Sequence, residues 1–184
     1  MAKDIKKIIA QEYLKCAKDP AYFMKKYCFI QHPTRGRILF ALYPFQEKIL
    51  HLFKDNQYII TLKSRQLGIS TLSAAYSLWL MLFHKDKNVL ALATTQATAR
   101  NLVTKTIFMY DQLPKWLKLR AVEKNKLSLR LKNGSKITAK SSNADAARSE
   151  AVSLLLIDEA AFIDNIDETY TAAQQTLATG GQCM

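Results

Sequence analysis

A polar run separates two apolar segments in the first half of this chain and limits the folds that it can adopt: Lys63-Ser64-Arg65-Gln66-Leu67-Gly68-Ile69-Ser70-Thr71. Residues 58–62 before it predict a β-strand, and residues 72–83 after it predict a helix. A loop between a strand and a helix N-terminus presents backbone N–H groups to an anion, so this context indicates a phosphate-binding loop. Lys63 stands where the usual motif has its first glycine, and Ile69 stands where it has its lysine. We therefore expect Lys63 to reach back over the phosphates, and the Ser70 hydroxyl to face Mg²⁺.

The second half of a nucleotide site is predicted downstream, at Leu154-Leu155-Leu156-Ile157 followed by Asp158-Glu159. A short, fully apolar run is typical of a strand buried on both faces. We expect Asp158 to hold Mg²⁺ and Glu159 to polarise the attacking water as a general base. A solvated strand end would also carry two acids, but the loop at 63–71 favours the nucleotide site.

Four stretches together resemble the ATPase domain of the large terminase subunit, the DNA-packaging motor of tailed bacteriophages. They lie within residues 20–184 and comprise 42–50, 63–70, 147–149 and 155–163. The resemblance implies an α/β fold of the P-loop NTPase (RecA/ASCE-like) class, in which helices flank a mostly parallel sheet. It also implies ATP and Mg²⁺ as cofactors. Many large terminases carry a deviant loop, some with its lysine at the beginning, although this chain lacks the lysine after Gly68 that one branch has.

The resemblance also assigns roles to single residues. Gln46 is similar to the adenine-recognising glutamine of terminases and helicases, and the neighbouring Phe45 would stack on the base. A helix-start glutamine on a polar face is the alternative. Arg148 is similar to an arginine that faces the nucleotide of a neighbouring subunit, whereas Arg65 would position the phosphates in its own subunit; a surface ion pair is the alternative for Arg148. The expected ATP-binding set in the loop is Lys63, Ser64, Arg65, Gln66, Leu67, Gly68, Ile69, Ser70 and Thr71.

The function implied by the resemblance is ATP hydrolysis coupled to translocation of double-stranded DNA into a procapsid. The implied partners are DNA, the portal protein, the small terminase subunit and further copies in a ring. The implied location is the host cytoplasm, with transient association with the procapsid. The chain ends before the nuclease domain of the family, so we expect a truncated ATPase domain without nuclease activity. A helicase-like DNA-remodelling ATPase and a nucleotide- or DNA-binding module without turnover remain alternatives.

The charge distribution favours a polyanion as a partner. The net charge is +12, and residues 111–140 carry nine basic and two acidic side chains. Within them, Leu127–Lys140 alternates apolar and basic residues around an Asn133-Gly134 turn, which predicts a β-hairpin. Its basic face indicates contact with a DNA backbone, or else a solvated sheet edge. The candidate DNA contacts are Arg130, Lys132, Lys136 and Lys140.

Two regions are expected: an N-terminal helical extension over residues 1–40 and a P-loop ATPase core over residues 41–184. The extension should contain helices at 3–18 and 21–27 and a turn-rich connector at 31–36. The core should contain helices at about 43–53 and 96–112 and a strand at 88–93. The three cysteines have no metal-binding or disulfide spacing, and no apolar run is long enough to span a membrane.

Overall fold

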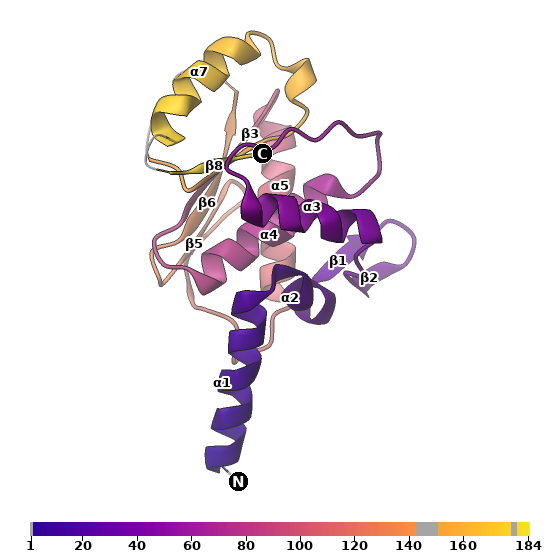
Figure 1. The fold of residues 1–184 in the computed structure, drawn as a ribbon, viewed down its shortest axis with the longest axis vertical. Helices are drawn as coiled ribbons and strands as arrows, with labels where there is room; N and C mark the ends of the chain where they lie inside the picture. Colours follow the sequence, from indigo (N-terminus) through magenta and orange to yellow (C-terminus); the bar gives the residue numbers. More distant parts are fainter. Residues whose placement is uncertain (1, 143–150, 178–179) are drawn as a thin grey trace.

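The protein is built on a six-stranded sheet, as shown by a computed structural model that describes residues 2–142, 151–177 and 180–184 (Figure 1). The strand order is β4-β5-β6-β3-β7-β8. Strands β6, β3, β7 and β8 pair in parallel, whereas β4 and β5 extend the sheet as antiparallel strands. This confirms the predicted α/β class. The strands are β3 (Asn88–Ala93), β4 (Ala121–Lys124), β5 (Ser128–Leu131), β6 (Lys136–Ser141), β7 (Leu154–Ile157) and β8 (Gln182–Cys183).

Helices cover both faces of the parallel strands. Helices α4 (Ile69–Phe83) and α5 (Gln96–Asp111) share one core with Val89 and Ala91, and α7 (Ile166–Leu177) packs on Leu90 and Leu92. Successive residues of a strand point to opposite faces, and both faces of β3 are covered, so its buried positions 89–93 all carry apolar side chains. The structure confirms the predicted strands at 88–93 and 154–157 and the predicted helices at 72–83 and 96–112 within a few residues.

The N-terminal part packs against α4. Its helices are α1 (Ala2–Lys18), α2 (Pro20–Tyr27) and α3 (Pro44–Asp55), and α1 projects from the body (Figure 1). The predicted turn-rich connector at 31–36 contains the turn of a β-hairpin. The hairpin strands are β1 (Phe29–His32) and β2 (Gly36–Leu39), which pair in antiparallel register. No helix in the described residues is long and apolar enough to cross a membrane.

The predicted strand at 58–62 is wrong beyond its first residue. Tyr58 forms an isolated parallel bridge with Cys183, and the N–H of Ile59 donates to the carbonyl of Cys183 at 2.9 Å. Ile60 and Leu62 are fully exposed, at 99% and 102% of their reference areas. Within the described residues, the backbone pairing of this segment stops at Ile59.

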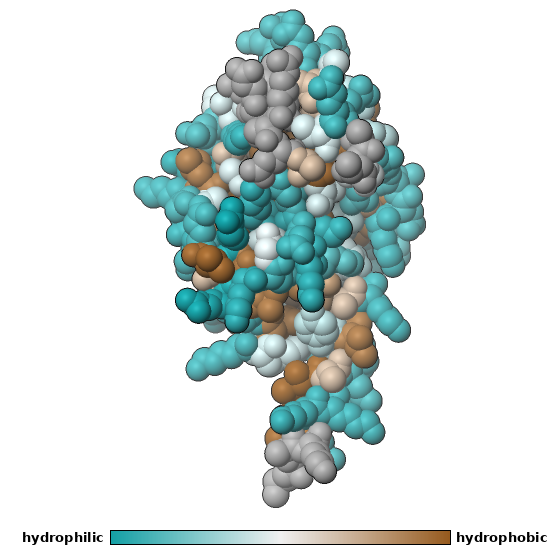
Figure 2. Space-filling view, turned by 90° about the vertical axis from the view of Figure 1, so that its left-hand side faces the viewer, coloured by the Kyte–Doolittle hydropathy of each residue, from teal (hydrophilic) through white to brown (hydrophobic). Residues whose placement is uncertain are grey.

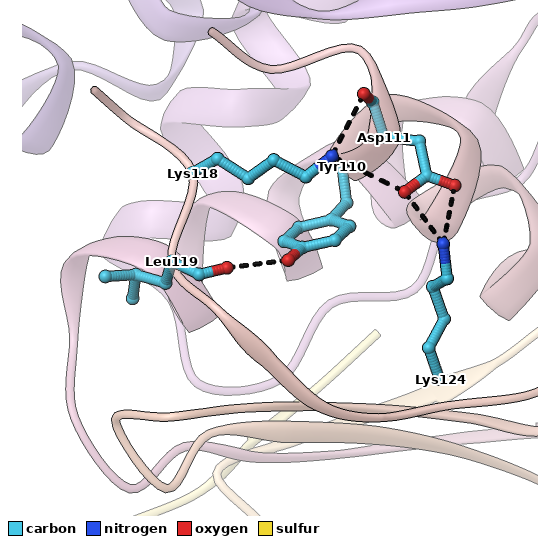
Figure 3. Close-up of polar contacts among 5 residues, drawn as sticks. All are labelled: Tyr110, Asp111, Lys118, Leu119 and Lys124. Carbon is cyan, nitrogen blue, oxygen red and sulfur yellow. Dashed lines mark hydrogen bonds and ion pairs between the residues drawn. The ribbon is translucent and has the colours of Figure 1, made fainter. Parts of the chain in front are cut away.

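The predicted hairpin at 127–140 is confirmed as β5 and β6, and β4 adds a third antiparallel strand. Polar contacts link β4 and the segment before it to the end of α5 (Figure 3). The Lys124 ammonium donates to both carboxylate oxygens of Asp111 at 3.0 and 3.1 Å. Lys118 donates to the Asp111 carbonyl at 3.1 Å and lies 4.6 Å from the ring centroid of Tyr110, whose hydroxyl donates to the Leu119 carbonyl at 2.6 Å. Cations at a helix C-terminus also interact favourably with the helix dipole.

Candidate functional site

The candidate site lies where the loop at 63–68 enters α4, beside the carboxyl end of β7. In open α/β sheets, ligands bind outside the carboxyl ends of parallel strands. The Ser70 hydroxyl donates a hydrogen bond of 2.8 Å to the Oδ2 atom of Asp158. The two residues are 88 positions apart in the sequence. The tertiary structure thus brings together the hydroxyl and the carboxylate that the sequence predicts as Mg²⁺ ligands.

The N-terminus of α4 is arranged to receive an anion. Gly68 is the residue before the helix, with a left-handed backbone (φ 71°), and as a glycine it has no side chain with which to cap the first turn. Gln66 also has a positive φ of 65°. Because the first N–H groups of a helix have no acceptor within the helix, an uncapped first turn leaves donors for a phosphate. Ile69, the first residue of α4, is buried. Its apolar side chain therefore packs against the protein at the position where the usual motif has a charged lysine.

The predicted charged groups belong to the two segments that meet at this helix end, the loop before α4 and the turn after β7. Lys63 and Arg65 are exposed, and within the described residues neither forms a hydrogen bond or an ion pair. Glu159 is exposed and has a left-handed backbone (φ 57°), which turns the chain directly after β7. Thr94, at the end of β3, donates to the carbonyl of Phe162 at 3.5 Å. Arg148 lies outside the described residues.

The Gln46 side chain, which the resemblance assigns to adenine binding, is buried and hydrogen-bonded within the protein. It is 1% exposed, accepts from the N–H of Tyr43 at 3.0 Å and donates to the carbonyl of Leu67 at 2.9 Å. The amide therefore connects the start of α3 to the phosphate-binding loop. Phe45 is 37% exposed and stacks on the ring of Tyr43, with ring centroids 5.7 Å apart. Adenine binding by Gln46 and Phe45 stays a prediction.

Sequence reasoning missed the contact of Gln46 with the loop. The sequence does indicate the hydrogen bond between Gln46 and Tyr43. Pro44 at the first helical position and a glutamine two residues later are typical of a helix start. The acceptor on Leu67 is 21 residues away, and no pattern in the sequence indicates it.

The residues present fit a magnesium ion. Mg²⁺ favours hard oxygen ligands, binds through one or two carboxylates together with substrate phosphates, and retains several waters. Ser70 and Asp158 supply one hydroxyl and one carboxylate next to the anion-binding helix end. Within the described residues, no cluster of three or more histidine, cysteine, aspartate or glutamate side chains forms another candidate metal site.

The four candidate DNA contacts lie on or beside β5 and β6. Leu129 of β5 and Ile137 of β6 are buried against the α4–α5 side, so Arg130 and Lys136 point to the opposite face, where they are paired in register. Figure 2 views the molecule from the side on which β5 and β6 lie in Figure 1, and hydrophilic residues predominate over the body there. Like charges directly opposite each other destabilise a sheet unless an opposite charge offsets them. DNA contact stays a prediction.

Comparisons with known proteins agree with this geometry. Residues 60–182 match the family described as terminase large subunit, T4likevirus-type, N-terminal. The large terminase of bacteriophage HK97 is similar over 91% of this chain and 36% of its own, with a TM-score of 0.71 and 18% identity. An ATPase-domain variant from the large terminase of Thermus phage P74-26 is similar over 78% of this chain and 63% of its own (TM-score 0.68, 17% identity). A large terminase from a thermophilic bacteriophage, solved with ADP, is similar over 78% of this chain and 38% of its own (TM-score 0.61, 17% identity).

Proposed function

Because this chain belongs to the T4likevirus-type family of terminase large subunits, of which it matches the N-terminal part, we propose that it is an ATP hydrolase that drives double-stranded DNA into a procapsid. The contact between Ser70 and Asp158 is the observation that carries the proposal. Two distant sequence motifs meet there at an uncapped helix N-terminus, as binding of a metal–triphosphate requires.

Each residue of the site has a role in this proposal. The N–H groups of the first turn of α4 bind phosphate oxygens, and Lys63 neutralises their charge from the start of the loop. Ser70 and Asp158 would hold the magnesium ion that accompanies ATP, and that ion would supply positive charge to the phosphates. Glu159, exposed beside Asp158, accepts a proton from the water that attacks the γ-phosphorus. Gln46 fixes the loop by its bond to Leu67.

The remaining parts of the proposal concern assembly. Arg148 is proposed to stabilise the transferring phosphoryl group of a neighbouring copy, with Arg65 as a positioning residue in its own subunit. The proposed partners are DNA, the portal protein, the small terminase subunit and further copies in a ring, in the host cytoplasm and transiently at the procapsid. This chain covers 36% of the HK97 large terminase, so these proposals concern the whole motor.

The test compares Asp158→Asn with Asp164→Asn, an exposed aspartate just beyond the site. ATP binding and hydrolysis are measured with and without Mg²⁺. We expect the wild type and Asp164→Asn to bind and hydrolyse ATP in a Mg²⁺-dependent way, whereas Asp158→Asn loses the Mg²⁺ dependence of binding and the turnover. Binding without turnover in the wild type, including when it is assembled on a portal ring, would favour the binding-module alternative. Absence of ATP binding would refute the proposal.

A further inference from the structure

The apolar stripe of α1 continues beyond the surface on which the helix packs. In the C-terminal half of α1, Cys16 is buried, and the ring centroid of Tyr13 lies 5.1 Å from that of Phe83. Residues three or four apart share a helix face, so Ile5 and Ile8 extend this stripe toward the N-terminus. They are 56% and 63% exposed on the part of α1 that projects from the body (Figure 1). The exposed half of the stripe is therefore available to a partner.

The projecting half of α1 also carries positive charge. Lys6 and Lys7 lie between Ile5 and Ile8 in the sequence, are exposed, and form no hydrogen bond or ion pair in the part of the chain that the structure describes. Partners in a specific interface match each other in charge as well as in apolar surface. A surface that covers Ile5 and Ile8 should therefore combine an apolar side chain with carboxylates.

The other end of the molecule has such a surface, at the 3₁₀ helix η1 (Ala160–Phe162) and the start of α7. Phe162 is 64% exposed. The side chains of Asp164, Asp167 and Glu168 are exposed and, among the described residues, form no hydrogen bond or ion pair. Residues 151–177 contain no lysine or arginine. Acids in the first turn also stabilise α7 through its dipole, but that effect does not account for an exposed phenylalanine beside them.

The two surfaces lie at opposite ends of the longest axis of the molecule, so one chain cannot bring its own α1 to its own α7 (Figure 1). A contact between different surfaces of identical chains is head-to-tail, and it forms a ring when the repeated rotation closes. We propose that the projecting half of α1 docks on η1 and α7 of another copy, with Ile5 and Ile8 against Phe162 and the two lysines facing the carboxylates. The inference rests on the proposed assembly of copies into a ring, for which it supplies a contact.

A charge swap tests the contact, with association measured by sedimentation equilibrium without nucleotide and folding checked by circular dichroism. Lys6→Glu/Lys7→Glu makes both surfaces acidic, and Asp167→Lys/Glu168→Lys makes both basic. The variant with all four substitutions restores opposite charges and keeps the net charge of the wild type. We expect either double variant alone to associate at least about tenfold more weakly than the wild type. Mixing the two double variants, or combining all four substitutions, should restore association.

A second comparison tests the apolar part of the contact. Ile5→Ser/Ile8→Ser should weaken association at least about tenfold, because it removes the apolar side chains that Phe162 would cover. Leu14→Ser is the matched control, since Leu14 is also 56% exposed but lies on the opposite face of α1. The control should associate like the wild type, and an equal loss in the control would contradict the assigned face.

A wild type that stays monomeric up to about 1 mM would overturn the inference. Association that tolerates both charge reversals and is lost only in Ile5→Ser/Ile8→Ser would also overturn it, because that pattern indicates pairing of α1 with α1. ATP binding and hydrolysis are measured separately on the same proteins. Loss of the contact with intact ATP binding would refute this inference alone, whereas absence of ATP binding would refute the proposed function.

Discussion

The Nε2 atom of Gln46 lies 2.9 Å from the position that a Cβ atom would occupy on Gly68. The same nitrogen donates to the carbonyl of Leu67 at 2.9 Å. Glycine at position 68 therefore permits both the left-handed backbone before α4 and the close approach of the Gln46 amide. The Gln46 side chain thus connects the start of α3 to the phosphate-binding loop.

Gly68→Ala should lower the free energy of unfolding and weaken ATP binding, because the added methyl group displaces Gln46 and strains the loop. Gly36→Ala is the matched control, since Gly36 has a similar φ of 65° and no atom within 4 Å of the added Cβ. The control should show the backbone cost alone, roughly 1–2 kcal/mol. Denaturant unfolding and ATP titration measure both effects. Equal losses in the two variants would show that the contact with Gln46 has no energetic role.

Lys63→Ala should reduce ATP turnover by about 10²-fold or more, as for removal of one group that stabilises developing charge. The fold should be unchanged, because Lys63 is exposed and forms no hydrogen bond or ion pair in the described residues. Lys54→Ala, at an exposed position near the end of α3, is the control. Steady-state hydrolysis and circular dichroism are the measurements. Normal turnover in Lys63→Ala would make Arg65 the better candidate for this charge.

Glu159→Gln should retain binding of ATP with Mg²⁺ and lose hydrolysis by about 10²–10⁴-fold, the range for removal of a general base. The amide keeps the size of the side chain but cannot take a proton from water. Titration with ATP and single-turnover hydrolysis separate the two steps. The exposed Glu168 of α7 offers the same substitution as a control. If Glu159→Gln weakens binding as much as Asp158→Asn does, the proposed division of roles is incorrect.

The double variant Arg130→Ala/Lys132→Ala should weaken binding of double-stranded DNA equally for unrelated sequences. Both side chains are exposed, on or next to β5. The slope of log affinity against log salt should become shallower by about 0.9 for each DNA phosphate that the variant no longer neutralises. Lys6→Ala/Lys7→Ala, on the projecting helix α1, removes the same net charge elsewhere and serves as the control. Equal effects of the two double variants would show that net charge alone governs binding.

The junction of α1 and α2 should lose stability in acid through Glu12. Hydrogen bonds from Lys26, Tyr22 and Tyr27 lower the pKa of Glu12 to about 2. Because this folded-state pKa lies below the ordinary value of 4.5, the stabilisation is complete above pH 4.5 and is lost as the pH falls toward 2.

Urea unfolding at pH 7 and pH 3 tests this prediction with Glu12→Gln. The variant should be less stable than the wild type at pH 7, and the difference should shrink at pH 3. Glu47→Gln is the control, since Glu47 forms one ion pair with Lys25 at 3.2 Å on the surface, and such pairs contribute little. A constant difference between wild type and Glu12→Gln at both pH values would contradict the assignment.

Local patterns in the sequence determined most of the elements and the chemical character of the site. The apolar run at 154–157 and the alternation around Asn133-Gly134 predicted β7 and the β5–β6 hairpin, because burial on one or two faces leaves a period in the sequence. The polar run at 63–71 predicted an anion-binding helix start, and Asp158-Glu159 predicted its acidic counterpart, since these functions depend on residue type.

Which of these groups meet, and which already form hydrogen bonds with other parts of the chain, depends on the tertiary structure. The contact of Ser70 with Asp158 and the bond from Gln46 to Leu67 span 88 and 21 residues, and long-range pairing has no local signature. Residues 58–62 have the composition of a strand, yet a strand needs backbone partners, and in the part of the chain that the structure describes the pairing stops at Ile59. Ile5 and Ile8 are exposed because α1 projects from the body, and that arrangement depends on how the whole chain folds.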